Sequence, residues 1–324
     1  MKTTTATAAI LAATLAWPAT AQDDPLEIVF THHSSSSNTF WQAVQKGFDD
    51  ACEKVGASCQ MIFTQTEGSV EQQAANMQAA LARQPDAILT SIVDDQALDG
   101  ILQDARDAGT IVIAVNVDDS EGAAGSPRQA FIGQGFVAAG QALAAAVAEQ
   151  FPAEGDLSVL LGVSAPGQNW SEQRAQGIEE GLAAYAEETG RTVEVERIDS
   201  GTDLAVTSDR VGAYLAANPE TNAYFDTGFW AAGVARVLRD RGVEPGAVLM
   251  GAFDLVPEVL REMEGGYVQA LVDQQPYAQG FLPVMQVYLA DAIGLSPSDV
   301  NTGTGVMGPD DVATIMDGSR QGIR

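Results

Sequence analysis

The chain has 324 residues, and its 44 Asp and Glu outnumber 16 Lys and Arg to give a net charge of -28. That length is typical of two domains, and a hydrophobic fraction of 46% with 19% charged residues excludes extensive disorder. Binding to nucleic acid or to an anionic membrane needs clustered Lys and Arg, which this composition does not favour. Two Cys are too few for a disulfide-dense scaffold or a four-thiolate zinc site, and two His are too few for a histidine-rich metal centre.

Residues 1–21 have the features of a secretory signal peptide. Lys2 precedes an apolar run over 8–16, Pro18 ends the run, and Ala19-Thr20-Ala21 forms a small-x-small cleavage site. The run is too short for a transmembrane helix, and no later run reaches the roughly 18 apolar residues that a membrane span needs. We therefore expect an exported protein whose signal peptide is cleaved.

Strand and helix patterns alternate from there to the end of the chain. Strands are predicted at 26–30, 59–63, 87–91, 111–115, 131–133, 157–161, 193–198, 223–225, 248–251 and 268–272. Helices are predicted at 38–55, 69–83, 96–108, 137–150, 171–188, 206–217, 230–241, 256–263 and 277–292. Apolar strands without alternation are typical of sheets covered by helices on both faces. The order predicts an α/β fold of parallel, doubly wound sheets, and ten strands are better divided into two sheets than placed in one.

Two cysteines, Cys52 and Cys59, lie on either side of a predicted helix end at Gly56. In an oxidising compartment a local disulfide between them is one interpretation, and two small buried hydrophobic side chains are the other. Neither interpretation makes them catalytic.

Motifs for cofactor chemistry are incomplete. The segment from Gly133 to Gly140 resembles a dinucleotide-binding loop, but its third Gly comes two positions late. A phosphate-binding loop with Lys-Ser or Lys-Thr and a Gly-x-Ser-x-Gly elbow are both missing from the sequence. His32 and His33 follow the first strand, and neighbours in a strand point to opposite faces, so a metal site is not expected. They are interpreted as polar loop residues, with one imidazole bonded to a ligand as the alternative.

Polar and aromatic side chains recur just after predicted strands, where doubly wound folds bind ligands. They are Asn38, Phe40 and Trp41 after the first strand, Asn116 and Asp118 after the fourth, Asn169, Trp170 and Arg174 after the sixth, Thr227 in the segment 226–230 after the eighth, Asp254 after the ninth, and Gln274 after the tenth. Each alone is more often a cap, a turn or a core residue, and Asn38 in particular suits a helix cap. Their repetition at strand ends predicts a binding site.

With these residues the sequence resembles the periplasmic solute-binding proteins of sugar ABC transporters, in the ribose-binding-protein-like group of type I. The most specific segments are Asn38-Thr39-Phe40-Trp41 with Gly47-Phe48, Pro85-Asp86-Ala87-Ile88, Gly251-Ala252-Phe253-Asp254, and Asp273-Gln274-Gln275-Pro276-Tyr277 with Gln279-Gly280. The resemblance covers nearly the whole chain after the signal peptide.

The resemblance implies two α/β lobes joined by a hinge of three crossings, near 131–135, 273–276 and 302–306. The N-terminal lobe would comprise 22–132 plus 275–303, and the C-terminal lobe 133–274 plus 304–324. It further implies a monomeric periplasmic protein, not an enzyme and without a cofactor. Such a protein captures a monosaccharide or polyol in an interlobe cleft and delivers it to the membrane permease of an ABC importer.

Site residues are carried over by position. The matches are Asn38 as an amide donor, Phe40 and Trp41 as a stacking pair, Arg174 as the guanidinium of the second lobe, Asp254 as a carboxylate that accepts from two hydroxyls, and Gln274 as the amide at the hinge. Asn116 and Val117 depart from the Asp-Arg pair of ribose binders, and Thr227 departs from the usual Asn-Asp. Asp118 is expected to supply the missing carboxylate, and His33 to fill vacated space.

Two alternatives stay open. The same fold would also hold a non-sugar or signalling ligand, such as a furanosyl signal or a nucleoside. A secreted carbohydrate-active enzyme is the other alternative, because carboxylates are abundant, although no catalytic pair can be placed by sequence.

Overall fold

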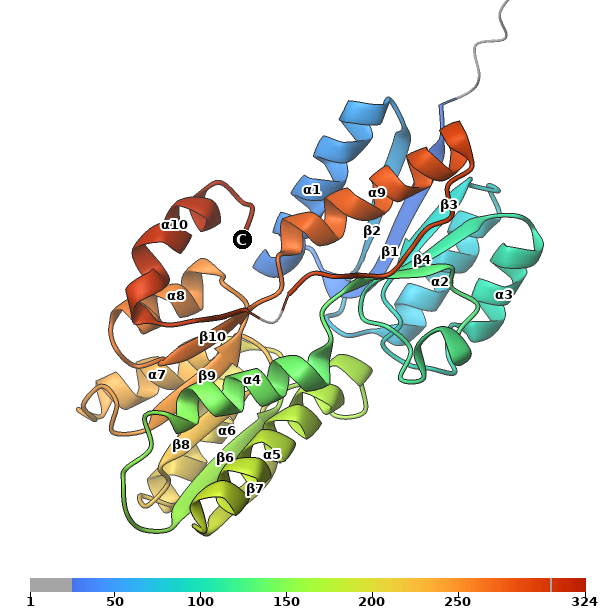
Figure 1. Cartoon of the computed structure of the whole chain (residues 1–324). Helices are drawn as coiled ribbons and strands as arrows, with labels where there is room; N and C mark the ends of the chain where they lie inside the picture. Colours follow the sequence, from blue (N-terminus) through green and yellow to red (C-terminus); the bar gives the residue numbers. More distant parts are fainter. Residues whose placement is uncertain (1–24, 304) are drawn as a thin grey trace, which may run out of the picture.

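The computed structural model describes residues 25–303 and 305–324, so the predicted signal peptide (1–21) lies outside the described residues. Two lobes are visible, each built on a six-stranded sheet (Figure 1). Within the described residues, no helix combines the length and the apolar character that a membrane crossing requires.

The first lobe, hereafter the N-lobe, is built on a parallel sheet. Its strands, in sheet order, are β11 (Val300–Asn301), β5 (Ala130–Gly133), β4 (Ile111–Asn116), β3 (Ala87–Thr90), β1 (Glu27–Ser35) and β2 (Ser58–Thr64). The helices α1 (Thr39–Val55) and α9 (Pro276–Ile293) cover one face, and α2 (Val70–Leu81) and α3 (Asp99–Asp107) cover the other (Figure 1). Apolar side chains of the strands are therefore buried on both sides.

The second lobe, the C-lobe, repeats this plan. Its strands, in sheet order, are β12 (Gly305–Met307), β10 (Ala270–Asp273), β9 (Leu249–Phe253), β8 (Ala223–Asp226), β6 (Leu157–Val163) and β7 (Val193–Asp199). The helices are α4 (Phe136–Ala148) and α5 (Asn169–Thr189) on one face, with α6 (Leu204–Ala217), α7 (Ala231–Asp240) and α8 (Pro257–Glu264) on the other, and α10 (Val312–Arg320) packed against α8. Only β12 runs antiparallel to its neighbour among the described strands.

The chain passes between the lobes after β5, after β10 and after β11 (Figure 1). The third passage includes Thr304, which lies outside the described residues. The two sheets have the same strand order, so β4 of the N-lobe corresponds to β9 of the C-lobe. Residues at or just after the carboxyl ends of parallel strands from both lobes line one cavity, so these strand ends point toward each other. The prediction of two doubly wound parallel-sheet lobes is confirmed.

The helices that follow the first two passages pack closely against a neighbouring helix. A Cβ atom on Gly280 of α9 would lie 1.9 Å from the Val44 carbonyl oxygen of α1, and a Cβ on Gly140 of α4 would lie 2.4 Å from the Arg174 carbonyl oxygen of α5. Such approach is possible only without side chains. The segment from Gly133 to Gly140 is thus a helix-packing sequence, which explains its irregular resemblance to a nucleotide loop.

Some elements differ from the prediction. Strand β1 continues to Ser35, so His32 and His33 are strand residues, and their interpretation as loop residues is wrong. The short strands β11 and β12 and the helix α10 were not predicted. Strands of two or three residues carry no periodic pattern and exist only through pairing with distant strands.

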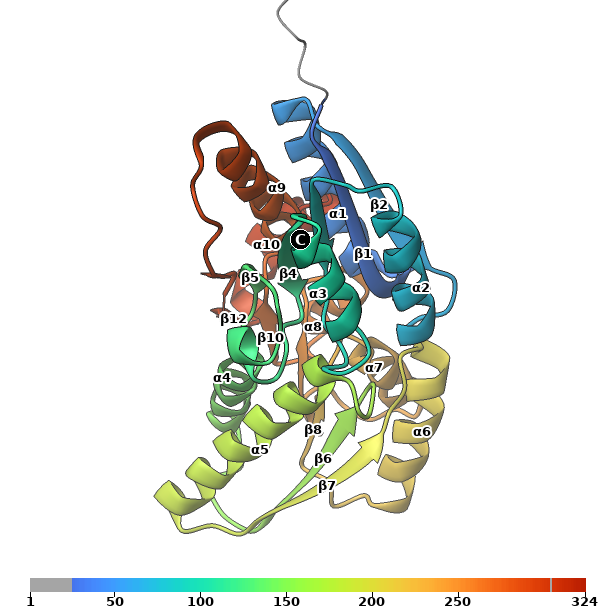
Figure 2. The same cartoon turned by 90° about the vertical axis from the view of Figure 1, so that its right-hand side faces the viewer.

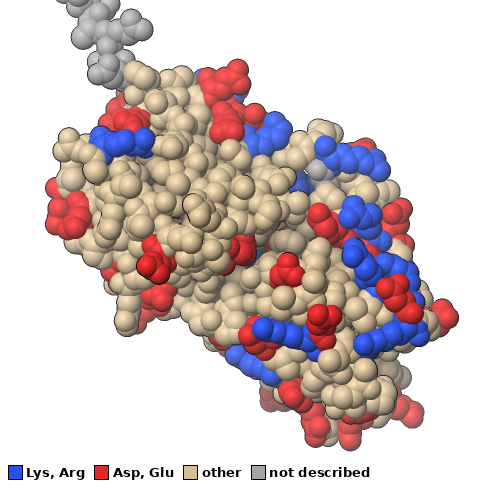
Figure 3. All heavy atoms as spheres, turned by 180° about the vertical axis from the view of Figure 1, so that it is seen from behind, with Lys and Arg blue, Asp and Glu red and all other residues tan. Residues whose placement is uncertain are grey.

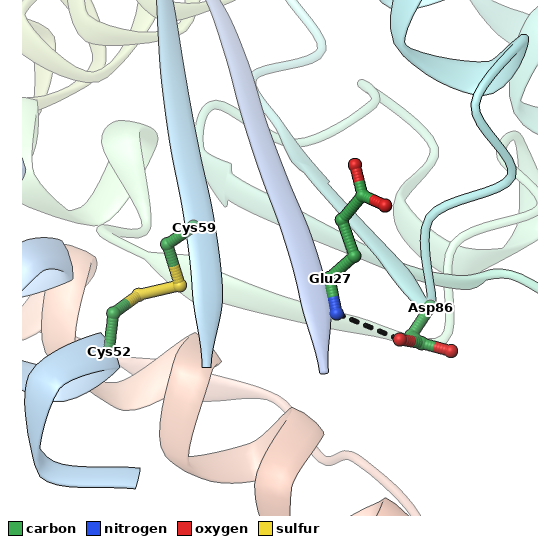
Figure 4. Close-up of a disulfide and its surroundings, with 4 residues drawn as sticks. All are labelled: Glu27, Cys52, Cys59 and Asp86. Atoms are coloured by element: carbon green, nitrogen blue, oxygen red, sulfur yellow. Dashed lines mark hydrogen bonds between the residues drawn. A yellow bond between two sulfur atoms is a disulfide. The ribbon is translucent and has the colours of Figure 1, made fainter. Parts of the chain in front are cut away.

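A disulfide joins Cys52, near the end of α1, to Cys59 of β2 (Figure 4). Nearby, the Glu27 backbone N–H at the amino end of β1 donates to the Asp86 carboxylate over 2.8 Å. Because the carboxyl ends of the strands face the gap between the lobes, the disulfide lies at the opposite end of the N-lobe.

Candidate ligand-binding cleft

A cavity between the lobes encloses about 380 Å³, including the part that opens to solvent. The lining residues are His33, Asn38, Phe40, Trp41, Glu67 and Asn116 from the N-lobe, Trp170, Arg174, Gly228, Phe229, Trp230 and Asp254 from the C-lobe, and Gln274 at the second passage.

The N-lobe lines the cavity with aromatic rings from the start of α1. The Trp41 ring stacks on His32 with centroids 4.0 Å apart, and the Phe40 ring packs edge-on against Trp41 at 5.6 Å. Both α1 residues are at most 4% exposed. The stack fixes the orientation of Trp41, so its position does not depend on a ligand.

Three more rings come from the C-lobe. Phe229 and Trp230 stack with centroids 4.7 Å apart, and Trp170 lies 6.3 Å from Trp230. A Cβ on Gly228 would lie 2.1 Å from the Trp230 ring. The indole can therefore pack directly against the backbone at this position because Gly228 has no side chain. Thr227 was selected from this segment, but its side chain is buried away from the cavity and bonds Ser164 and Ser171. Thr227, expected at the binding site, therefore does not line this cavity, and the following Gly228, Phe229 and Trp230 line it instead.

Arg174 is the only cationic side chain that lines the cavity in the part of the chain that the structure describes. Its Nη1 donates to the Thr227 carbonyl oxygen over 2.8 Å, and its guanidinium lies 4.1 Å from the centroid of Phe253. Burial lowers the pKa of Arg174 to about 10, although Asp254 and Asp226 oppose the shift, so the group stays charged at neutral pH. Its Nε is buried without a hydrogen-bond partner among the described residues.

Asn116 and Asp254 occupy corresponding places, at the ends of β4 and β9, and both have a φ of 70°. Such positive values are uncommon outside Gly, though Asn and Asp tolerate them best. Burial raises the pKa of the Asp254 carboxyl, and the Arg174 charge opposes this. Strained residues of this kind cluster at functional sites.

Amide side chains connect these two residues through the hinge. Gln274 Nε2 donates to Asp254 Oδ1 over 2.5 Å, and Asn116 Nδ2 donates to Gln274 Oε1 over 3.0 Å. Gln279 Nε2 donates to Thr302 Oγ1 over 3.0 Å, which ties the second passage to the third. The polar lining residues Asn116 and Asp254 are thus both hydrogen-bonded to Gln274 at the second passage.

Both histidines are buried and uncharged at neutral pH. His33 Nδ1 lies 2.9 Å from Ser91 Oγ, and burial lowers the pKa of His33 to about 4, opposed by Glu67. Burial likewise lowers the pKa of His32 well below its ordinary value. His33 reaches the cavity, whereas His32 lies behind Trp41.

Glu67 lines the cavity and was not predicted. Its carboxylate accepts from Ser34 Oγ at 2.6 Å, from the Ser35 backbone N–H at 2.8 Å and from Asn38 Nδ2 at 3.0 Å. Asn38 also caps α1, because its Oδ1 accepts from the Phe40 backbone N–H. The position of Glu67 after the second strand was the signal that could have found it.

Two further predicted residues lie outside the cavity lining. The Asp118 carboxylate accepts from Arg128 Nε at 2.6 Å and Nη2 at 2.7 Å, so it neutralises a buried cation and does not replace the missing carboxylate. Asn169 Nδ2 donates to Asp95 of the other lobe over 2.5 Å. Among the residues that the structure describes, no group of three or more His, Cys, Asp or Glu is placed to hold a metal ion.

Comparison with known proteins gives consistent results. A family model described as a periplasmic binding protein domain matches residues 28–295. The xylose/arabinose-binding protein of Sulfolobus acidocaldarius is 28% identical over 293 residues, which is 86% of this chain and 70% of that protein. A solved ABC sugar transporter protein (periplasmic sugar binding protein) from Legionella pneumophila is 27% identical with a TM-score of 0.77, covering 86% of this chain and 99% of that one.

A carbohydrate transporter from Acidothermus cellulolyticus in complex with myo-inositol has a TM-score of 0.79 at 24% identity, covering 93% of this chain and 100% of that one. At this identity the likeness shows the fold alone. The family model spans most of the chain and strands of both lobes. This chain therefore belongs to the family of periplasmic binding protein domains.

Proposed function

We propose that this chain is an exported solute-binding protein that captures a monosaccharide or polyol between its lobes and delivers it to an ABC importer. The observation that carries the proposal is the composition of the cavity, in which aromatic faces from both lobes surround Arg174 and Asp254. A sugar ring has apolar C–H faces and a rim of hydroxyls that donate and accept. Flat rings cover the faces, and charged or amide groups bond the rim.

The buried Nε of Arg174 supports a ligand acceptor at this position. A buried donor without a partner costs about 1–3 kcal/mol, and a hydroxyl oxygen of the ligand would remove that cost. Because lining residues come from both lobes, a ligand makes all its contacts only in the closed form. This differential affinity is what drives closure.

The printed names of the relatives support the same ligand class. The Sulfolobus acidocaldarius relative is named for xylose and arabinose, and a D-allose-binding periplasmic protein of Escherichia coli is 25% identical over 252 residues. For this chain we infer a neutral polyhydroxylated ligand, a periplasmic location, a permease partner and a monomeric state. We infer no catalytic activity.

A thermal-shift screen of the mature protein tests the proposal. The panel contains D-xylose, L-arabinose, D-allose, D-galactose, myo-inositol and two nucleosides. A ligand at 100 times its dissociation constant adds about 2.7 kcal/mol to the folded state and raises the Tm by several degrees. A rise in Tm with one stereochemical group of sugars supports the proposal. The absence of any Tm shift with the sugars rejects it, provided that the screen is repeated after unfolding and refolding to remove bound ligand.

A nucleoside is the second candidate, favoured by one observation. The rings of Trp41, Trp170 and Trp230 come from both lobes, and such faces also enclose a planar base. A response to nucleosides without a response to sugars would replace the first proposal by this one.

A further inference from the structure

The N-terminal end of α5 reaches across to the N-lobe near α3 (Figure 2). Gln168 and Asn169 make five hydrogen bonds to the N-lobe there, and neither residue lines the cavity. Gln168 Nε2 donates to the Gly68 carbonyl oxygen over 3.0 Å, and the Asn169 backbone N–H donates to the Val93 carbonyl oxygen over 3.1 Å. The other three come from Asn169 Nδ2, which donates to Asp95 Oδ1 over 2.5 Å, to the Ile92 carbonyl oxygen over 3.3 Å and to the Asp118 carbonyl oxygen over 3.4 Å.

These bonds serve the end of a helix. The first N–H groups of an α-helix have no partner within the helix, and a side chain usually caps them. Gln168, at the cap position of α5, makes no such side-chain bond. The backbone N–H of Asn169 instead bonds the Val93 carbonyl of the other lobe, so one N–H group at the start of α5 has its partner across the lobes.

Asp95 is held for this contact by its own lobe. Its carboxylate accepts from Ser120 Oγ at 2.5 Å and from the Ser120 backbone N–H at 3.0 Å. Hydrogen bonds from Ser120 and Asn169 outweigh the effect of burial and lower the pKa of Asp95, so the carboxylate is ionised at neutral pH. A hydrogen bond to an ionised acceptor is stronger than one between neutral groups.

The same segment is connected to the cavity on both sides. The indole Nε1 of Trp170 donates to Gln168 Oε1 over 2.8 Å, and Trp170 lines the cavity. Across the gap, Gly68 directly follows Glu67, another lining residue. A ligand that orders Trp170 therefore also orders Gln168 for its bond to the N-lobe.

We propose that Gln168, Asn169 and Asp95 form a rim latch that stabilises the closed form without contacting the ligand. Asn169 is then a positioning residue: it acts on affinity through closure. The expected effect of the latch on ligand affinity rests on the proposed function. Its effect on closure of the lobes does not, because closure is measured in the empty protein.

The variant Asn169→Asp tests the latch. It places a second carboxylate against Asp95 only when the lobes are closed. Asp is favourable in the first turn of a helix, so the fold of the C-lobe is preserved and the Tm of the empty variant stays within a few degrees of the wild type. In the empty variant we expect a larger radius of gyration by small-angle X-ray scattering. We also expect faster hydrogen exchange at the backbone N–H of position 169, which bonds the Val93 carbonyl in the wild type.

A second substitution separates charge repulsion from a general defect. Adding Asp95→Asn to the Asn169→Asp background removes the like charge and should return the radius of gyration and the exchange rate toward the wild type. The two variants share the same residue at 169, so their intrinsic exchange rates are equal. Gln173→Glu is the matched control, since it adds one charge to the same helix from a residue outside the cavity lining.

Affinity provides the second readout, measured by calorimetry with the strongest-binding sugar of the panel. Losing a hydrogen bond to a charged group weakens binding about 10- to 100-fold, so we expect this loss for Asn169→Asp, and a smaller one for the double variant. Equal scattering and exchange in wild type and Asn169→Asp would overturn the latch. If no panel sugar binds, the proposed function fails, while scattering and exchange in the empty protein still decide the latch.

Discussion

The two lobes present different surfaces to the same cavity. The N-lobe contributes the rings of Phe40 and Trp41 and the uncharged imidazole of His33, whose pKa burial lowers to about 4. The C-lobe contributes the guanidinium of Arg174, which stays charged, and the carboxylate of Asp254. Both lobes thus offer aromatic faces on which a ring can lie, but among the described lining residues the guanidinium comes from the C-lobe.

The two lobes also differ in the hydrogen bonds around their buried acidic side chains. In the C-lobe, the buried Asp226 accepts from Ser164 Oγ at 2.9 Å, Tyr224 Oη at 2.8 Å and the Gly228 backbone N–H at 2.8 Å. Burial disfavours the ionised form of Asp226, and these donors together with the Arg174 charge partly oppose that effect. In the N-lobe the carboxylate of Glu67 accepts hydrogen bonds from Ser34, Ser35 and Asn38, all in the N-lobe.

The largest effect is expected at the charged face. Asp254→Ala should weaken binding of the best panel sugar by about 2–4 kcal/mol, because a carboxylate that accepts buried hydroxyls is lost. Calorimetry measures the change, and Asp254→Asn, which keeps the shape and one acceptor, should lose less. Unchanged affinity in Asp254→Ala would show that the ligand does not use this face.

The second prediction concerns pH. Burial raises the pKa of Asp226 to about 6, above its ordinary value of 3.8, so its protonated form is favoured by folding. The resulting stabilisation, about 3 kcal/mol, is complete below pH 4 and is lost as the pH rises through 6. His33 acts oppositely: folding favours its neutral form, so stability is lost as the pH falls from 6.5 to 4.

Urea unfolding between pH 4 and 7.5 separates these contributions. Asp226→Asn removes the first of them, so the unfolding free energy of this variant should rise more steeply with pH than that of the wild type. His33→Asn should have the opposite effect on the slope. If the unfolding free energies of wild type and Asp226→Asn changed equally with pH, the raised pKa of Asp226 would be contradicted.

The lobes also differ in covalent support, since the disulfide between Cys52 and Cys59 belongs to the N-lobe. Replacing both residues by Ser should lower the unfolding free energy by about 2–3 kcal/mol, because the closed loop is short. Ligand affinity should change less than twofold, since the bond lies at the far end from the cavity. A large loss of affinity would indicate that N-lobe stability controls the site.

The smallest effect is expected at the aromatic part of the C-lobe. Gly228→Ala pushes the Trp230 ring away from the backbone and should weaken sugar binding by about 1 kcal/mol, in the range of one aromatic contact. Gly308→Ala is the control, because a Cβ there meets nothing within 4 Å. Equal affinities of both variants would show that Trp230 does not contact the ligand.

The surface agrees with the role in capture rather than nucleic-acid binding. On the face shown in Figure 3, Lys and Arg side chains lie beside Asp and Glu rather than in a separate patch. Arg197, for example, bonds Glu179 over 2.6 Å and Glu172 over 3.1 Å. Such mixed charges favour solubility.

The sequence by itself determined the two-lobed α/β fold and most of the cavity. Buried parallel strands are apolar throughout and helices repeat every 3.6 residues, so both leave local patterns. Residues just after strands, such as Trp41, Arg174 and Asp254, could be placed because parallel strands end at one edge of the sheet.

The tertiary structure alone decided which polar side chains near that edge reach the cavity. Asp118 turns to Arg128, and Asn169 turns to Asp95 in the opposite lobe. Thr227 faces the interior of its own lobe, while Glu67 reaches the cavity from a loop. These choices depend on partners 10 to 74 positions away in the chain, and no local pattern records which partner a short polar side chain will meet.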